Sequence, residues 1–171
     1  MNIKLSLLAI VEVLSGLSIG IVIMIITYKM LKWIGRRYYD IHQNNVAYSI
    51  FVASVLFAVG YMVSGVVQPL LSLFRIMAAS ESSTTALLFS FVGYGAVYIA
   101  ASYTAGVVVS LLGITIYTGL TPLDEFAELK NNNLGVALIV GTIIIVLTLL
   151  TRDGVNLLME SQIPYPAHFT Q

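Results

Sequence analysis

Three charged residues interrupt apolar stretches of the sequence, and they are the strongest candidates for chemistry. Glu12 lies in the first apolar stretch, while Arg152 and Asp153 lie late in the last one. A charge inside a lipid-embedded helix costs about 2.5–3.5 kcal/mol on insertion scales, so such a residue usually has a partner or a function. A carboxylate beside a guanidinium could relay protons, or bind an ion or a small polar solute.

A depth estimate indicates that these charges can meet. At a rise of about 1.5 Å per residue, Glu12 lies about 33 Å from Ile34, near the end of the first stretch. Arg152 lies about 27 Å from Leu134, where the last stretch begins. The sequence therefore predicts an intramembrane polar cluster of Glu12, Arg152 and Asp153 near the outer leaflet. The alternative is a structural ion pair, or charges that already lie among the headgroups.

The elements that must position this cluster are membrane-spanning helices. Of the 171 residues, 58% are apolar and 9% are charged, and the mean hydropathy is +0.95. A soluble domain usually carries about 25% charged residues, so these charges are too few to coat a water-facing surface. Lipid accepts apolar side chains on helices, whose backbone groups are paired internally. The net charge is +0, so no nucleic-acid partner is expected.

Four apolar stretches are long enough to cross a bilayer, which takes about 20 residues of helix. They cover about 5–33, 46–74, 86–120 and 134–161. We therefore predict an all-α polytopic membrane protein with four transmembrane helices, forming a single membrane domain over residues 1–171. A cleavable signal peptide is the alternative at the N-terminus. Because the apolar run continues past Ser18 to Ile26, longer than an h-region of about 7–15 residues, we expect an uncleaved first span.

A short amphipathic helix is predicted before the fourth span, over about 122–130. Thr121 would be its N-cap and Pro122 its first helical residue. Asp124, Glu125 and Glu128 would form its acidic face. This face is interpreted either as a docking site for a basic partner or as a solvated surface.

The distribution of cations predicts the orientation. The first connector region holds Lys29, Lys32, Arg36 and Arg37, whereas the second holds only Arg75. The positive-inside rule then places the first and third connectors in the cytoplasm and both termini outside.

The two halves of the chain resemble each other at a fixed offset. Residues 40–47 align with residues 128–135 at 88 positions (128 minus 40). Asn45 and Asn133 fall on each other, and each could cap the helix that follows. We interpret the halves, about 5–74 and 86–161, as two hairpins duplicated in parallel. The alternative is a chance similarity between apolar helices.

The second junction also resembles a known family. The stretch Asp124–Ala137, with Gly141 beyond it, is similar to the junction of the DUF350 family of small bacterial integral membrane proteins. The first half repeats the pattern more weakly, in Asn45–Ala47 and Ala53. The sequence departs from the pattern at Leu134-Gly135, where a small aliphatic residue and then Ala are expected. The resemblance implies a duplicated two-helix hairpin in the bacterial plasma (inner) membrane. The family has no settled biochemical activity, so the resemblance does not indicate one.

Polar and small residues form a stripe along the third span. Tyr94, Tyr98, Ser102, Gly106 and Ser110 are each four residues apart, so they share one helix face. We interpret the stripe as a packing seam; the alternative is the lining of a water-filled path.

Three classes of function are considered: an accessory or scaffold subunit, a small conducting or transporting subunit, and, ranked last, a membrane-embedded enzyme. The chain has no cysteine, no phosphate loop and no catalytic motif, and His42 and His168 lack the spacing of metal ligands. We therefore expect no enzyme, no metal and no cofactor. The favoured interpretation is an accessory or scaffold subunit that packs against other membrane subunits or copies of itself. The alternative is a small ion- or proton-conducting subunit that uses Glu12, Arg152 and Asp153.

Overall fold

The computed structural model describes residues 3–41, 45–80, 84–121 and 124–161, which are helical except at short turns and helix ends. Side chains are described from residue 16 onward, except at residues 75, 78–80, 84, 86 and 88. The helices are α1 (Ile3–Tyr39), α2 (Val46–Ser64), α3 (Val67–Ser80), α4 (Thr84–Leu120), α5 (Glu125–Lys130) and α6 (Leu134–Glu160). The predicted all-α fold is confirmed.

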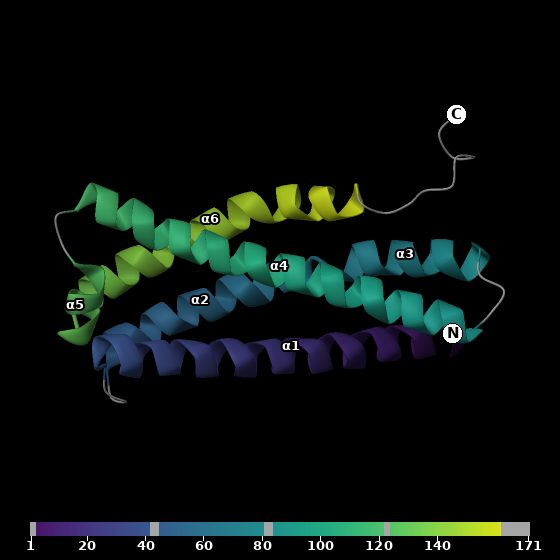
Figure 1. The fold of residues 1–171 in the computed structure, drawn as a ribbon, viewed down its shortest axis with the longest axis horizontal. Helices are drawn as coiled ribbons and strands as arrows, with labels where there is room; N and C mark the ends of the chain where they lie inside the picture. Colours follow the sequence, from purple (N-terminus) through teal and green to yellow (C-terminus); the bar gives the residue numbers. More distant parts are fainter. Residues whose placement is uncertain (1–2, 42–44, 81–83, 122–123, 162–171) are drawn as a thin grey trace.

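Four segments are long and apolar enough to cross a membrane. They are Gly16–Tyr39, Val46–Phe74, Phe89–Leu120 and Leu134–Glu160, which agrees with the four predicted spans. Along the long axis in Figure 1, α1 and α4 run in one direction, and α2, α3 and α6 run in the other. The α1–α2 and α4–α6 connections therefore lie at the same end, where α5 also lies.

The second span consists of two helices rather than one. α2 ends at Ser64, and α3 begins at Val67 after a turn at Gly65. Pro69 explains the break, because its ring clashes with the carbonyl of the residue four positions earlier, which is Gly65. In the first turn of α3 the missing N–H of Pro69 has no helical partner to lose. A single span with a kink near Pro69 was predicted; the structure ends one helix and begins another.

The core of the bundle is built around α2. This helix packs against α1, α4, α5 and α6, and its residues Ala47, Ala58, Val59 and Met62 are fully buried. Helices in lipid gain no hydrophobic free energy from meeting, so their contact depends on close packing of small residues. Ala47 and Ala58 lie eleven residues apart (58 minus 47), on the same face of α2, and provide such a surface there.

Glycines of α4 and α6 make the closest approaches to their neighbours. A Cβ at Gly106 of α4 would lie 2.8 Å from Cα of Val59, and Gly141 of α6 lies against the side chain of Ser54. Along the predicted α4 stripe, Ser102 and Ser110 are buried, whereas Tyr94 is exposed. The part of the stripe from Ser102 to Ser110 therefore packs inside the bundle.

The outer surface carries large apolar side chains on the long helices. Exposed examples are Ile21, Ile25, Val97, Leu112, Leu138 and Leu150. Such a surface is suited to lipid tails and unsuited to water. The fold is that of a membrane protein.

Three predicted boundaries are wrong. α1 continues to Tyr39, so the basic residues 29–37 lie on a helix rather than in the connector. α3 continues to Ser80 and α4 begins at Thr84, which shortens the second connector. Thr121 is not the N-cap of α5, because its hydroxyl donates to the carbonyl of Tyr117 in α4. Asp124 caps α5 instead.

Candidate functional sites

Arg152 lies where α6 passes the end of α2. Its guanidinium donates from Nη1 to the Tyr61 hydroxyl at 3.3 Å and from Nη2 to Ser64 Oγ at 3.4 Å. The guanidinium carbon lies 4.2 Å from the centroid of the Tyr61 ring. Cation–π attraction of this kind strengthens when the cation is desolvated. Arg152 is half-buried, so aromatic and hydroxyl groups replace much of its water shell.

The side chains that receive Arg152 are held by α2 itself. The Tyr61 ring stacks on Phe57, with centroids 5.5 Å apart. The Ser64 hydroxyl donates to the carbonyl of Tyr61 at 2.8 Å, so its lone pairs are free to accept from Arg152. Because Tyr61 and Ser64 are three residues apart, they occupy one helix face. Tyr61 and Ser64 at the end of α2 therefore form a preorganised binding site for a cation.

Two polar atoms beside this cation-binding site have no hydrogen-bond partner among the described residues. They are Nε of Arg152 and Oδ1 of Asn156, both of which are buried. Asn156 lies one helical turn beyond Arg152, against Gly65 in the turn between α2 and α3. An unpaired polar group buried in protein costs about 1–3 kcal/mol. The α2–α3 break is thus bordered by groups that retain unused hydrogen-bonding capacity.

Within the described residues, Arg152 and Asp153 do not form the pairing that the predicted cluster of Glu12, Arg152 and Asp153 requires. Asp153 is exposed, and no ion pair joins it to Arg152 within the described residues. The side chain of Glu12 lies outside the described part of the chain, so its pairing with Arg152 stays a prediction. Tyr61, Ser64 and Asn156 were not among the predicted site residues.

The opposite end of the bundle holds a polar junction centred on Asn45. Its Oδ1 accepts from the Tyr48 amide at 2.7 Å and caps α2. Its Nδ2 donates to the carbonyls of Leu129 and Lys130 at 2.6 and 3.0 Å. These are the last carbonyls of α5, and the Leu129 carbonyl also accepts from the Asn132 amide at 3.0 Å. One side chain therefore ties the start of α2 to the end of α5.

Asn132 and Asn133 complete the junction from the other side. Asn132, with a φ of 60°, accepts from the Ala47 amide at 2.9 Å. Asn133 caps α6 by accepting from the Val136 amide at 3.3 Å, and it donates to Glu128 at 2.8 Å. Lys130 also forms an exposed ion pair with Asp40 at 3.3 Å. The starts of α2 and α6 are thereby held side by side.

The three acids around α5 have different environments. Asp124 accepts from the amides of Phe126 and Ala127 as the N-cap, and Glu128 is bonded to Asn133. Glu125 is 5% exposed, with Oε1 lacking a partner among the described residues. The three carboxylates therefore do not form one shared solvated face. α5 is further anchored by Phe126, which stacks on Tyr39 with centroids 4.0 Å apart.

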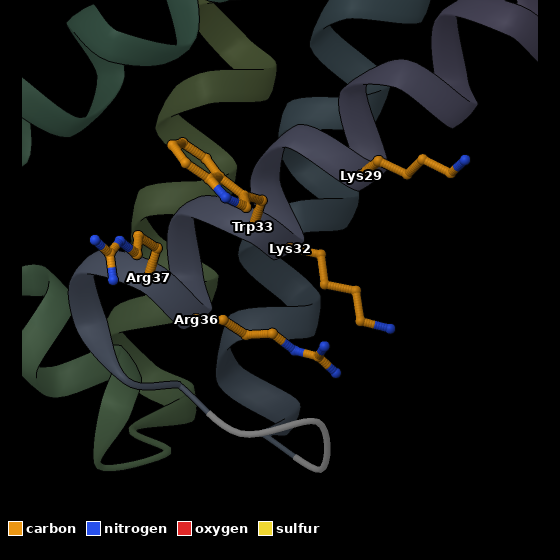
Figure 2. A pocket seen from close by; sticks show the side chains of 5 residues that line it. All are labelled: Lys29, Lys32, Trp33, Arg36 and Arg37. Carbon is orange, nitrogen blue, oxygen red and sulfur yellow. The ribbon is translucent and has the colours of Figure 1, made fainter.

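Basic residues occupy the last three turns of α1. Figure 2 shows a shallow hollow lined by Lys29, Lys32, Trp33, Arg36 and Arg37. Arg37 and Trp33 project to one side of the helix in this view, and Lys32 and Arg36 to the other. An aromatic residue with flanking cations is typical of a helix end at the membrane surface.

Within the described residues no group of three or more His, Asp or Glu side chains is placed to hold a metal ion. His42 and His168 lie outside the described residues.

The fold and these sites define a class: a small polytopic membrane protein with four apolar helices and charged ends. The chain belongs to the DUF350 family, a domain of unknown function, whose family model matches residues 5–155. This confirms the resemblance noted at the second junction. No curated protein and no solved structure shows a significant match to the chain.

Proposed function

We propose that the protein is a non-enzymatic subunit of a membrane assembly, which packs through its helices against copies of itself or other membrane proteins. The supporting observation is an open face of small residues on α4. Ala96, Ala100 and Thr104 are exposed and four residues apart, and Gly93 has nothing within 4 Å of its Cβ position. Small residues let two helices approach closely in lipid. The protein's own fold uses the other side of α4, where Gly106 and Gly113 contact α2 and α6.

Native mass spectrometry of the detergent-extracted protein tests this proposal. The double substitution Ala96→Leu/Ala100→Leu places two bulky groups on the open α4 face, and it should convert the assembly to a monomer. Gly154→Leu on α6 is the control, because it adds bulk where nothing lies within 4 Å. A wild-type protein that is monomeric and free of partner subunits, both in detergent and after crosslinking in intact membranes, would rule out the assembly role.

We further propose that the two halves are parallel repeats with both termini outside a bacterial plasma membrane. α2 and α6 begin at Asn caps 88 positions apart (133 minus 45) and run in the same direction. Ser64 and Arg152, which are hydrogen-bonded, are separated by the same 88 positions. The basic end of α1 favours a cytoplasmic location for the end of the bundle that holds the polar junction.

A second candidate function is conduction of ions or protons. The half-buried Arg152 has no carboxylate partner among the described residues, and unpaired atoms lie next to it. Such an arrangement favours a site that water or an anion enters. Reconstituted protein would then show flux in liposomes, and Arg152→Gln and Glu12→Gln would reduce it without reducing folded yield. Liposomes with wild-type protein and no flux above the background of empty vesicles would exclude conduction by this chain alone.

A further inference from the structure

A groove between α1 and α2 changes from charged to apolar along its length. It has a volume of about 390 Å³. Its lining residues include Lys32, Arg36 and Asn45 at the mouth, Tyr28 and Ser49 further in, and Val52, Ala53 and Leu56 at the deep end. The mouth lies at the polar junction, and the deep end lies within the second span. The groove therefore follows the direction of a lipid molecule in a leaflet.

The cations at the mouth are aligned along one face of α1. Tyr28, Lys32 and Arg36 are four residues apart, which places them on the same side of the helix. Lys32 is half-buried, and its Nζ lies 5.7 Å from the centroid of the Tyr28 ring. Neither Lys32 nor Arg36 forms an ion pair within the described residues. Two positive charges thus border the groove, and no acid among the described residues is paired with them.

We propose that this groove binds one anionic phospholipid from the surrounding leaflet. Its phosphate-bearing headgroup lies between Lys32 and Arg36, because guanidinium and ammonium groups make charge-assisted hydrogen bonds to phosphate oxygens. One acyl chain lies along Val52, Ala53 and Leu56. Basic pockets between helices at the membrane surface suit such headgroups.

The length of the groove matches one leaflet. Leu56 is eleven residues beyond Asn45 (56 minus 45), a distance of about 16 Å along α2. Half of a hydrocarbon core of about 30 Å is about 15 Å. A soluble phosphate would occupy the charged mouth and leave the apolar floor empty, whereas a phospholipid fills both. Ala53, which is exposed, provides the width because its side chain is a single methyl group.

The test uses native mass spectrometry of the full chain in detergent, with phosphatidylglycerol or phosphatidylcholine of equal chain length added. The wild type should retain one phosphatidylglycerol, and Lys32→Ala/Arg36→Ala should weaken its retention about tenfold or more. The matched control, Lys29→Ala/Arg37→Ala, removes the same charge from residues that line the basic hollow but not the groove. It should bind as the wild type does.

A second variant separates the groove from surface charge. Ala53→Phe fills the apolar floor without changing any charge, and it should also reduce phosphatidylglycerol retention. Equal losses in the two double variants would mean diffuse attraction to a basic surface, and the proposal would fail. It would also fail if phosphatidylcholine were retained to the same extent as phosphatidylglycerol. Displacement of the lipid by glycerol phosphate alone would also overturn it. None of these outcomes depends on the assembly role.

Discussion

Among the described residues, the guanidinium of Arg152 is accommodated in an apolar helix by contacts with neutral groups alone. A ring face at 4.2 Å and two hydroxyl oxygens at 3.3 and 3.4 Å surround it. The planar guanidinium can stack and donate at the same time, which a lysine ammonium cannot do. The site is therefore specific for arginine rather than for positive charge.

This specificity predicts the behaviour of substitutions at Arg152. Arg152→Ala should lower the free energy of unfolding by about 1–2 kcal/mol, since hydrogen bonds of a charged group contribute about 1.5–3 kcal/mol at good geometry and these are long. Arg152→Lys should recover only part of the loss. Denaturant titration in micelles measures both values, and a double-mutant cycle with Tyr61→Phe isolates the hydroxyl contact. Asp153→Ala, at the exposed neighbour, should change stability by less than about 0.5 kcal/mol; an equal effect there would contradict a specific site.

The sequence singles out Arg152 by its type, but it does not reveal its partners. Tyr61 and Ser64 are common residues in apolar helices, and nothing marks them until α2 and α6 are known to be neighbours. A count of residues supplies the missing signal. Ser64 is 18 residues from the start of α2 (64 minus 46), and Arg152 is 18 residues from the start of α6 (152 minus 134). Two parallel helices that begin together bring these residues to equal depth.

Asn45 makes more contacts than a helix cap requires, and its removal should cost more than that of Asn133. Loss of a cap costs about 1 kcal/mol. Asn45→Ala also removes the donor of the Lys130 carbonyl and one of the two donors of the Leu129 carbonyl, which still accepts from the Asn132 amide. We therefore expect a cost of about 2 kcal/mol. Asn133→Ala should cost about 1 kcal/mol. Thermal unfolding in detergent, with the exposed Asn131→Ala as the control, measures the difference; equal losses would show that the link to α5 contributes nothing.

At the scale of elements, apolar length predicts the spans well, whereas polar side chains decide where each helix begins and ends. Pro69 lies inside a continuous apolar stretch, and only its clash with the Gly65 carbonyl divides α2 from α3. Thr121 and Asp124 are both good N-caps, so the sequence alone does not choose between them. The structure chooses Asp124, whose Oδ1 accepts from two amides.

Packing between α4 and α2 predicts opposite effects at two glycines of the same helix. Gly106→Ala places a Cβ 2.8 Å from the Val59 backbone, so the helices must move apart at a cost of about 1–3 kcal/mol. Gly119→Ala meets nothing within 4 Å, and it should stabilise the helix by up to about 1 kcal/mol. Unfolding by SDS titration separates the two variants. A Gly106→Ala protein as stable as the wild type would contradict the close contact of α2 and α4.

At the scale of the whole molecule, the central place of α2 is what the sequence does not predict. All four spans are apolar on every side, so periodicity does not distinguish an inner face from a lipid-facing one. The small residues carry some of this information, since Ala47, Ala58 and Gly141 are buried while Leu138 and Leu150 are exposed. Small size alone does not predict burial, because Gly16 and Gly154 each have nothing within 4 Å of their Cβ positions.

The path of the chain predicts which connectors share a side of the membrane. The protein has no cysteine, so single cysteines can be introduced without a prior substitution. Tyr38→Cys and Asn131→Cys lie at the end of the bundle that holds the polar junction, and Glu160→Cys lies 26 residues beyond Leu134 (160 minus 134). That separation is about 39 Å of helix, more than a hydrocarbon core of about 30 Å.

An impermeant maleimide should label only Glu160→Cys in intact cells and all three variants after lysis. If Tyr38→Cys and Asn131→Cys alone reacted in intact cells, the orientation would be reversed and the fold unchanged. If those two reacted differently from each other, the end of α1 and the start of α6 would lie on opposite sides of the membrane. The junction at Asn45 could then not form.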